Sequence, residues 1–127
     1  MLLDLLTGDP EFGPASREAV RDARRLGKLI ACEVVWAETG GAFETADAAH
    51  KALDELGVEF SPLDVEASLN ASQAWRAYRR AGGARDRVVA DFLVAAHASA
   101  HADRLLTRDR GFYRTQFDGL AVVDPTD

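Results

Sequence analysis

The sequence predicts an α/β fold in which parallel strands are covered by helices, and three observations support this. Segments with helical periodicity alternate along the chain with short runs of aliphatic and β-branched residues. Strands separated by helices pair in parallel through right-handed crossovers, which gives a three-layer sandwich around a central parallel sheet. The length of 127 residues and the 47% hydrophobic composition suit one globular domain. We therefore expect a single domain over residues 1–127.

The first half of the chain predicts two short strands among three helices. Ser16 is a good N-cap for the first helix, and Gly27 ends it. Gly57 ends the third helix in the same way. The expected helices cover residues 16–26, 34–40 and 43–56, and the expected strands cover residues 28–32 and 58–60.

The second half predicts two longer helices and two more strands. Asp64 caps a helix over 64–81 that ends at Gly82-Gly83, and an alanine-rich helix follows over 86–102. The remaining expected strands cover residues 104–107 and 120–123. In a parallel sheet of this kind, the functional site lies at the carboxyl ends of the strands.

The composition excludes several classes of protein. No apolar run approaches the roughly 20 residues needed to span a bilayer, and the first six residues lack a basic signal-peptide region. Cys32 is the single cysteine, so it forms no internal disulfide, which is typical of the reducing cytoplasm. We therefore expect a cytoplasmic protein without a membrane segment.

The charge is distributed unevenly along the chain. The net charge is −6, yet residues 76–114 hold nine arginines and only four acidic residues. One interpretation is a solvated helix surface that uses arginine. The other is a basic surround for a polyanionic substrate, since the arginine fork suits phosphate. We favour the second because the best candidate catalytic aspartates lie in this stretch.

Four positions are candidates for catalysis. Glu38 follows the apolar run 34–37, and Asp91 begins the apolar helical segment 91–98. Thr107 lies at the end of a predicted strand, and Asp109 comes two residues after it. Carboxylates gathered at strand ends repel one another unless a cation lies among them. Oxygen ligands without a Cys/His set favour Mg²⁺, with Mn²⁺ as an alternative, and both suit phosphate chemistry.

Each candidate also has a simpler interpretation. Glu38 is then a surface residue of its helix, Asp91 a capping residue, and Asp109 the start of a turn over 108–111. His97 and His101 have the spacing of a zinc pair, but without an obvious third ligand set we expect packed or surface histidines.

The motifs around these positions resemble a known family. Residues 91–98 and 105–113 are similar to the C-terminal half of a PIN-domain ribonuclease, in particular the VapC toxins of toxin–antitoxin pairs. Residues 35–38 resemble the second acidic motif of that family, and residues 117–125 continue the likeness. The resemblance implies Mg²⁺-dependent endonucleolytic cleavage of RNA by an acidic cluster of Glu38, Asp91 and Asp109. It also implies a homodimer and a cognate antitoxin whose tail occludes the active site.

Four arginines are expected to hold the RNA backbone, and Thr107 is expected to orient a ligand or a water molecule. The four arginines are Arg85, Arg87, Arg108 and Arg110.

The sequence departs from the family pattern at its beginning. PIN domains open with a central strand that ends in an aspartate, whereas residues 1–6 resemble the segment after that motif, and Asp4 falls too late to replace it. Loss of a central strand exposes the edges of its neighbours and leaves a hole in the core. We favour a native start upstream of Met1 over a degenerate gene copy. The expectation is that the 127-residue form is insoluble or inactive and that an upstream extension ending in Asp rescues it.

Two rival functions stay open at this point. A catalytically impaired PIN-fold protein would bind an antitoxin or RNA without cutting, and the missing first aspartate favours it. A phosphohydrolase acting on small esters ranks lowest, because it needs a nucleophilic Asp at the end of the first strand.

Overall fold

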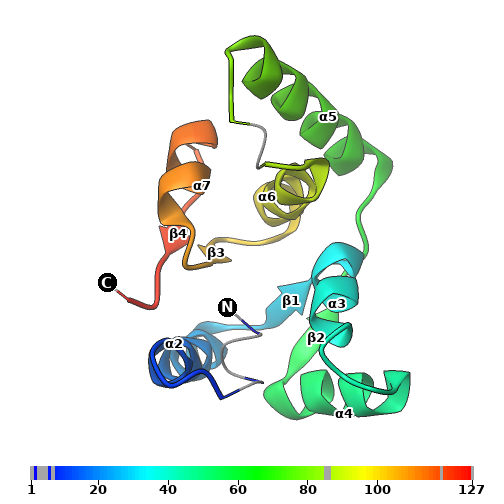
Figure 1. Cartoon of the computed structure of the whole chain (residues 1–127), viewed down its shortest axis with the longest axis vertical. Coiled ribbons are helices and arrows are strands. Elements are labelled where there is room, and N and C mark those ends of the chain that lie inside the picture. The colour runs from blue at the N-terminus through cyan, green and yellow to red at the C-terminus, as the bar shows by residue number, and fades with distance from the viewer. Residues whose placement is uncertain (1, 3–5, 7, 85–86, 118, 127) are drawn as a thin grey trace.

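The computed structural model describes residues 2, 6, 8–84, 87–117 and 119–126. Helices and short strands alternate along the chain, as Figure 1 shows by colour and label. The described helices are α2 (Gly13–Leu26), α3 (Glu33–Gly40), α4 (Ala46–Leu56), α5 (Val65–Arg80), α6 (Val89–His101) and α7 (Arg110–Gln116). The described strands are β1 (Leu29–Ala31), β2 (Val58–Phe60), β3 (Leu105–Leu106) and β4 (Val122–Val123).

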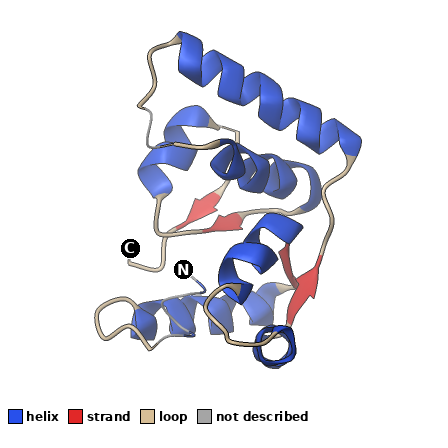
Figure 2. Cartoon of the chain, turned by 45° about the vertical axis from the view of Figure 1, so that its right-hand side comes forward, coloured by secondary structure: helices blue, strands red, loops and turns tan. Residues whose placement is uncertain are grey.

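The strands pair in parallel, which confirms the predicted α/β class, but they form two sheets instead of one. Strand β1 pairs with β2, with Leu29 opposite Val58. Strand β3 pairs with β4, with Leu105 opposite Val122. Figure 2 shows the two pairs as separate groups of strands with helices around them. Strand β2 has the predicted bounds, whereas β1, β3 and β4 are shorter than the sequence predicts.

The prediction that Ser16 caps the first helix is wrong. Helix α2 begins three residues earlier, at Gly13, and Ser16 lies inside it with 0% of its surface exposed. Pro14 lies in the first turn, where a proline is favoured because its missing N–H has no partner there anyway. The Asp9 carboxylate instead accepts the N–H groups of Glu11 and Phe12, each at 2.9 Å.

Most other helix ends lie where local chemistry predicts them. The Asp64 carboxylate accepts the Ala67 N–H at 2.8 Å and caps α5. Helix α4 begins at Ala46 instead of residue 43 because Thr45 caps it, with 3.1 Å from Ala48 N to Thr45 Oγ1. Gly27 ends α2, and Gly57 ends α4 with a left-handed backbone, φ +77°.

Helix α7 is not among the elements predicted from the sequence, where a turn over 108–111 is the simpler interpretation of Asp109. Asp109 stands at its N-cap position, and the helix runs to Gln116. Its aromatic residues explain why it forms, because Phe112 and Tyr113 pack against α6 and its neighbours. The expected helix over 86–102 begins at Val89, and Asp86 lies outside the described residues.

The apolar core lies in separate clusters on the two sides of the molecule. One surrounds Phe92, which is 0% exposed and lies against small residues of α5, Ala67 and Ala71. The rings of Tyr78 and Phe112 complete it, with centroids 5.4 Å from that of Phe92. A different cluster joins Ala31 and Val58 of the β1–β2 pair to Leu53 of α4.

Among the described helices, none combines the length and the apolar character needed to cross a membrane.

Candidate active site

A cavity of about 1030 Å³ opens between the two sheets. Residues of both β1 and β3 line it, and the helices α2 and α6 contribute further walls. Much of the lining is aliphatic, but polar side chains from several elements also reach it. These are Glu38, Thr39, Asp91, His97, Thr107, Tyr113 and Asp124 among others.

Glu38 lies on α3, the helix that follows β1, and lines this cavity. The helix starts directly after the strand because Cys32, buried at 1% exposure, is its extended N-cap residue. The Glu38 residue is exposed, so its carboxylate carries little desolvation cost. It is therefore both a surface residue of its helix and a cavity residue.

Asp91 lies in the first turn of α6 and combines two roles. Its Oδ2 accepts the Val88 N–H at 3.1 Å, which is the capping contact that the simpler interpretation expects. The residue is half-buried and also lines the cavity. The capping bond fixes the carboxylate at the start of the helix, next to this space.

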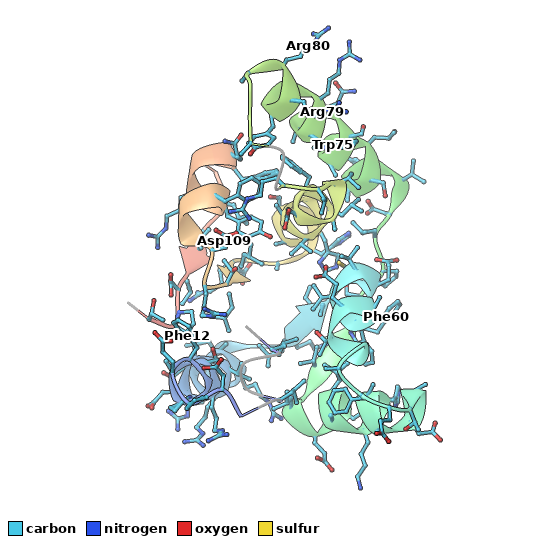
Figure 3. All side chains as sticks on the ribbon, viewed as in Figure 1. Phe12, Phe60, Trp75, Arg79, Arg80 and Asp109 are labelled. Atoms are coloured by element: carbon cyan, nitrogen blue, oxygen red, sulfur yellow. The ribbon has the colours of Figure 1, made fainter. Side chains whose placement is uncertain are left out.

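Thr107 and Asp109 are held together at the end of β3. The Thr107 Oγ1 accepts the Asp109 N–H at 3.1 Å, which fixes the backbone between the strand and α7. The Asp109 carboxylate binds both terminal nitrogens of the Arg87 guanidinium, with 3.1 Å from Nη2 to Oδ1. The same guanidinium lies 4.2 Å from the ring centroid of Phe112. Figure 3 places Asp109 between β3 and α7.

Tyr113 links the three predicted acids electrostatically. Burial raises the pKa of its phenol far above the usual range, and the carboxylates of Asp91, Asp109 and Glu38 raise it further. The Arg87 cation opposes this effect. Tyr113 is 6% exposed and lines the cavity, so the phenol stays protonated there. Tyr113 is absent from the predicted site residues because nothing in the sequence pattern distinguishes it from a core aromatic.

Asp124 is a second cavity residue that is absent from the predicted site. It is 7% exposed, and its Oδ1 accepts the N–H and the hydroxyl of Thr126 at 2.8 and 2.6 Å. The sequence could have indicated Asp124, because an acidic residue near the carboxyl end of a predicted strand is a site candidate. Asp124 comes directly after β4, and Asp109 comes three residues after β3.

The four arginines predicted to bind RNA have different surroundings. Arg87 is paired with Asp109. Arg108 is exposed and stacks on Phe12, with 3.9 Å from its guanidinium carbon to the ring centroid. Arg85 and the side chain of Arg110 lie outside the described residues.

The two histidines of the zinc-like pair bind separate partners. His97 Nε2 lies 2.9 Å from Ser61 Oγ, and His101 Nε2 lies 3.2 Å from Asp64 Oδ2. Burial, followed by the charge of His101, lowers the pKa of His97. These contacts join α6 to the segment after β2; His97 is buried and His101 is exposed.

The oxygen groups of the cavity are of the kind that binds a hard divalent cation. Within the described part of the chain, no three Asp, Glu, His or Cys side chains lie close enough together to hold a metal ion. Glu38 and Asp91 nevertheless share the cavity with the Thr107 hydroxyl, and Mg²⁺ is commonly bound by one or two carboxylates and several waters. Oxygen donors of this kind favour Mg²⁺ or Mn²⁺ over Zn²⁺.

Comparisons with known proteins agree with this architecture. The family model described as "PIN domain" matches residues 1–118. A structure of VapBC-1 from nontypeable Haemophilus influenzae is similar with a TM-score of 0.73 and 17% identity, over 99% of this chain and 93% of that one. A structure of VapBC2 from Rickettsia felis bound to a promoter DNA fragment has a TM-score of 0.64 and 12% identity, over 97% and 91%. Among curated proteins, none matches the sequence.

The family model covers nearly the whole chain, and the fold of this chain is similar to that in the VapBC structures. The chain therefore belongs to the PIN-domain family.

Proposed function

We propose that this protein is a metal-dependent endoribonuclease, the toxin component of a type II toxin–antitoxin pair, and that residues 1–127 act as one nuclease domain. PIN domains of the VapC type are generally nucleases that use divalent metals. The observation that carries the proposal is the meeting of Glu38, Asp91 and Thr107 on one cavity. Asp109, the third acid, does not line this cavity but lies two residues after Thr107, where it pairs with Arg87.

The cavity residues would have different roles in hydrolysis. Glu38 and Asp91 would hold Mg²⁺, with Mn²⁺ as the alternative, and a bound ion of this kind activates water and stabilises charge on phosphorus. The capping bond from Val88 keeps the Asp91 carboxylate in place. The Thr107 hydroxyl accepts the Asp109 N–H and so fixes the backbone position of Asp109 after β3. Tyr113 stays neutral and offers an O–H donor in the same cavity.

The exposed arginines between residues 76 and 114 would bind the RNA backbone. Arg76, Arg79 and Arg80 are exposed on α5, and Figure 3 shows Arg79 and Arg80 at its far end beside Trp75. The guanidinium carbon of Arg79 lies 5.2 Å from the Trp75 ring centroid, a cation–π contact. Arg108 is exposed and precedes Asp109 at the end of β3.

The proposed partner is an antitoxin protein, and the proposed assembly is a homodimer. The similar solved structures are VapBC complexes, one of them on promoter DNA, which supports a protein partner for this chain.

Cleavage of RNA by the chain that carries the upstream extension expected from the sequence, with Mg²⁺ and with EDTA, tests the proposal, and the 127-residue form is assayed beside it. Asp91→Asn keeps the size of the side chain and removes the charge, so cleavage should fall by at least about 100-fold. Glu66→Gln in the first turn of α5 makes the same chemical change outside the cavity and should cleave normally. Cleavage that persists in EDTA or in Asp91→Asn would count against a metal-dependent site.

A second candidate is a PIN-fold protein that binds RNA or an antitoxin without cutting. Its specific support is the ion pair of Asp109 with Arg87, which occupies one of the three acids. Tight RNA binding without cleavage, in both Mg²⁺ and Mn²⁺, would favour this candidate.

A further inference from the structure

Arg108 and Phe12 form a stacked pair beside the cavity. The guanidinium carbon of Arg108 lies 3.9 Å from the Phe12 ring centroid, closer than the 4.2 Å between Arg87 and Phe112. Arg108 is exposed and Phe12 is half-buried, so the pair is accessible at the surface. The contact joins the start of α2 to the end of β3, and Figure 3 shows Phe12 beside α2, on the same side of the molecule as Asp109.

Hydrogen bonds fix the backbone on both sides of this pair. The Thr107 N–H donates to the Val123 carbonyl at 3.0 Å, and the Thr107 hydroxyl accepts the Asp109 N–H at 3.1 Å. On the α2 side, the Asp9 carboxylate accepts the Phe12 N–H at 2.9 Å. A ligand that binds the pair therefore orders little additional backbone, which favours its binding.

Two observations favour a flat, uncharged group over a phosphate on Arg108. The Phe12 ring supports the planar guanidinium, and unpaired bases of RNA stack on guanidinium planes. The Phe12 N–H lowers the pKa of the Asp9 carboxyl, and the nearby Arg108 cation also lowers it. The negative charge of Asp9 repels a phosphate but leaves a neutral base unaffected.

The pair also lies next to the candidate site. Thr107 directly precedes Arg108 and lines the cavity. Ala15 of α2 lines it too, three residues after Phe12. Residues three apart at a helix lie on the same side of it. A base on this pair therefore belongs to a nucleotide near the phosphate that the cavity would hold.

We propose that Arg108, supported by the Phe12 ring, stacks on an unpaired base of the RNA substrate beside the cavity. The inference rests on the proposed function, since its ligand is RNA. Arg108 contacts the base, and Phe12 is a positioning residue that acts through Arg108. Stacking tolerates every base because each has a flat face, so the pair selects single-stranded RNA without reading its sequence.

Fluorescence anisotropy in EDTA, on the extended chain of the cleavage assay, measures binding apart from metal-dependent cleavage. One probe is a labelled single strand of about ten adenylates, and the other is an abasic strand of the same length and charge. Arg108→Lys keeps the charge and removes the plane, so binding of the adenylate strand should weaken at least about fivefold. Binding of the abasic strand should change less than about twofold, because its phosphates still meet a cation.

Variants of Phe12 test the positioning role. Phe12→Leu keeps an apolar side chain without the ring and should weaken binding of the adenylate strand about as much as Arg108→Lys does. Phe12→Trp restores an aromatic surface and should restore this binding. Arg25→Lys makes the same change as Arg108→Lys at an exposed arginine of α2, 3.2 Å from Asp22, and should leave the binding of both strands unchanged.

Three results would overturn the proposal. The first is an equal loss of binding for both strands in Arg108→Lys, which indicates a phosphate contact. The second is unchanged binding of the adenylate strand by Phe12→Leu. The third is an unmodified chain that binds neither strand.

The assay also separates this proposal from the nuclease function. Binding that depends on the bases and on Arg108, in a chain that does not cleave RNA in Mg²⁺, supports the stacking pair and contradicts the nuclease function. Cleavage by a chain whose binding is the same for both strands supports the nuclease function and contradicts the stacking pair.

Discussion

Asp109 shows how much a single contact shapes the candidate site. Its carboxylate binds the Arg87 guanidinium in the forked geometry that arginine favours, and the guanidinium also stacks on Phe112. Arg87 thus orients Asp109 in the structure, and its predicted contact with RNA stays a prediction.

The Arg87 contact should contribute measurably to stability. Arg87→Ala is expected to lower the free energy of unfolding by about 1–2 kcal/mol, from the lost ion pair and stacking together. Arg76→Ala removes an exposed arginine of α5 and should change it by less than about 0.5 kcal/mol. Urea unfolding measures both, and equal stability of the two variants would show that the Arg87 contact is weak.

At the scale of elements, the helix ends follow local chemistry more closely than the strands do. The side chains of Asp64 and Thr45 accept free N–H groups at helix starts, and Gly57 adopts the left-handed backbone that ends α4. The strands contain only two or three residues each, so packing against helices decides their lengths. Helix α7 illustrates the same point, because aromatic contacts with other elements stabilise it.

Gly57 gives a prediction for the end of α4. Its backbone has φ +77°, so Gly57→Ala should lower the free energy of unfolding by about 1–2 kcal/mol. The new Cβ would also come within 2.7 Å of the Arg24 guanidinium, which is flexible and moves aside. Gly27→Ala at the end of α2 is the control, since its backbone is extended and nothing lies within 4 Å. Similar losses of stability in both variants in thermal unfolding would contradict this account.

At the scale of the whole molecule, polar contacts join the β1–β2 side to α6. His97 binds Ser61, His101 binds Asp64, and the Leu63 N–H donates to Glu33 at 2.9 Å. These contacts tie the segment after β2 to both α6 and α3. The two sheets are not paired with each other, so these side-chain contacts help to hold the β1–β2 pair to α6.

His97 makes this junction sensitive to pH. Its pKa in the folded chain lies below 6.5, so the unfolded chain binds more protons as the pH falls through that range. The free energy of unfolding should therefore fall between about pH 7.5 and about pH 5.5. His97→Gln should show a smaller fall in urea unfolding over this window. An identical pH dependence in both proteins would exclude His97 as the cause.

The α/β class, the order of the main helices and most of their ends could be predicted from the residues alone, because periodicity and capping are local properties. The sequence also indicated a gap in the central sheet, and the structure has a cavity between two separate sheets. Tertiary packing decided which polar groups lie together. Glu38 and Asp91 line the same cavity, whereas Asp109 forms an ion pair with Arg87. Packing likewise brought Tyr113 to the site. These contacts join residues far apart in the chain, and no local pattern specifies which distant side chains will lie within a few ångströms of each other.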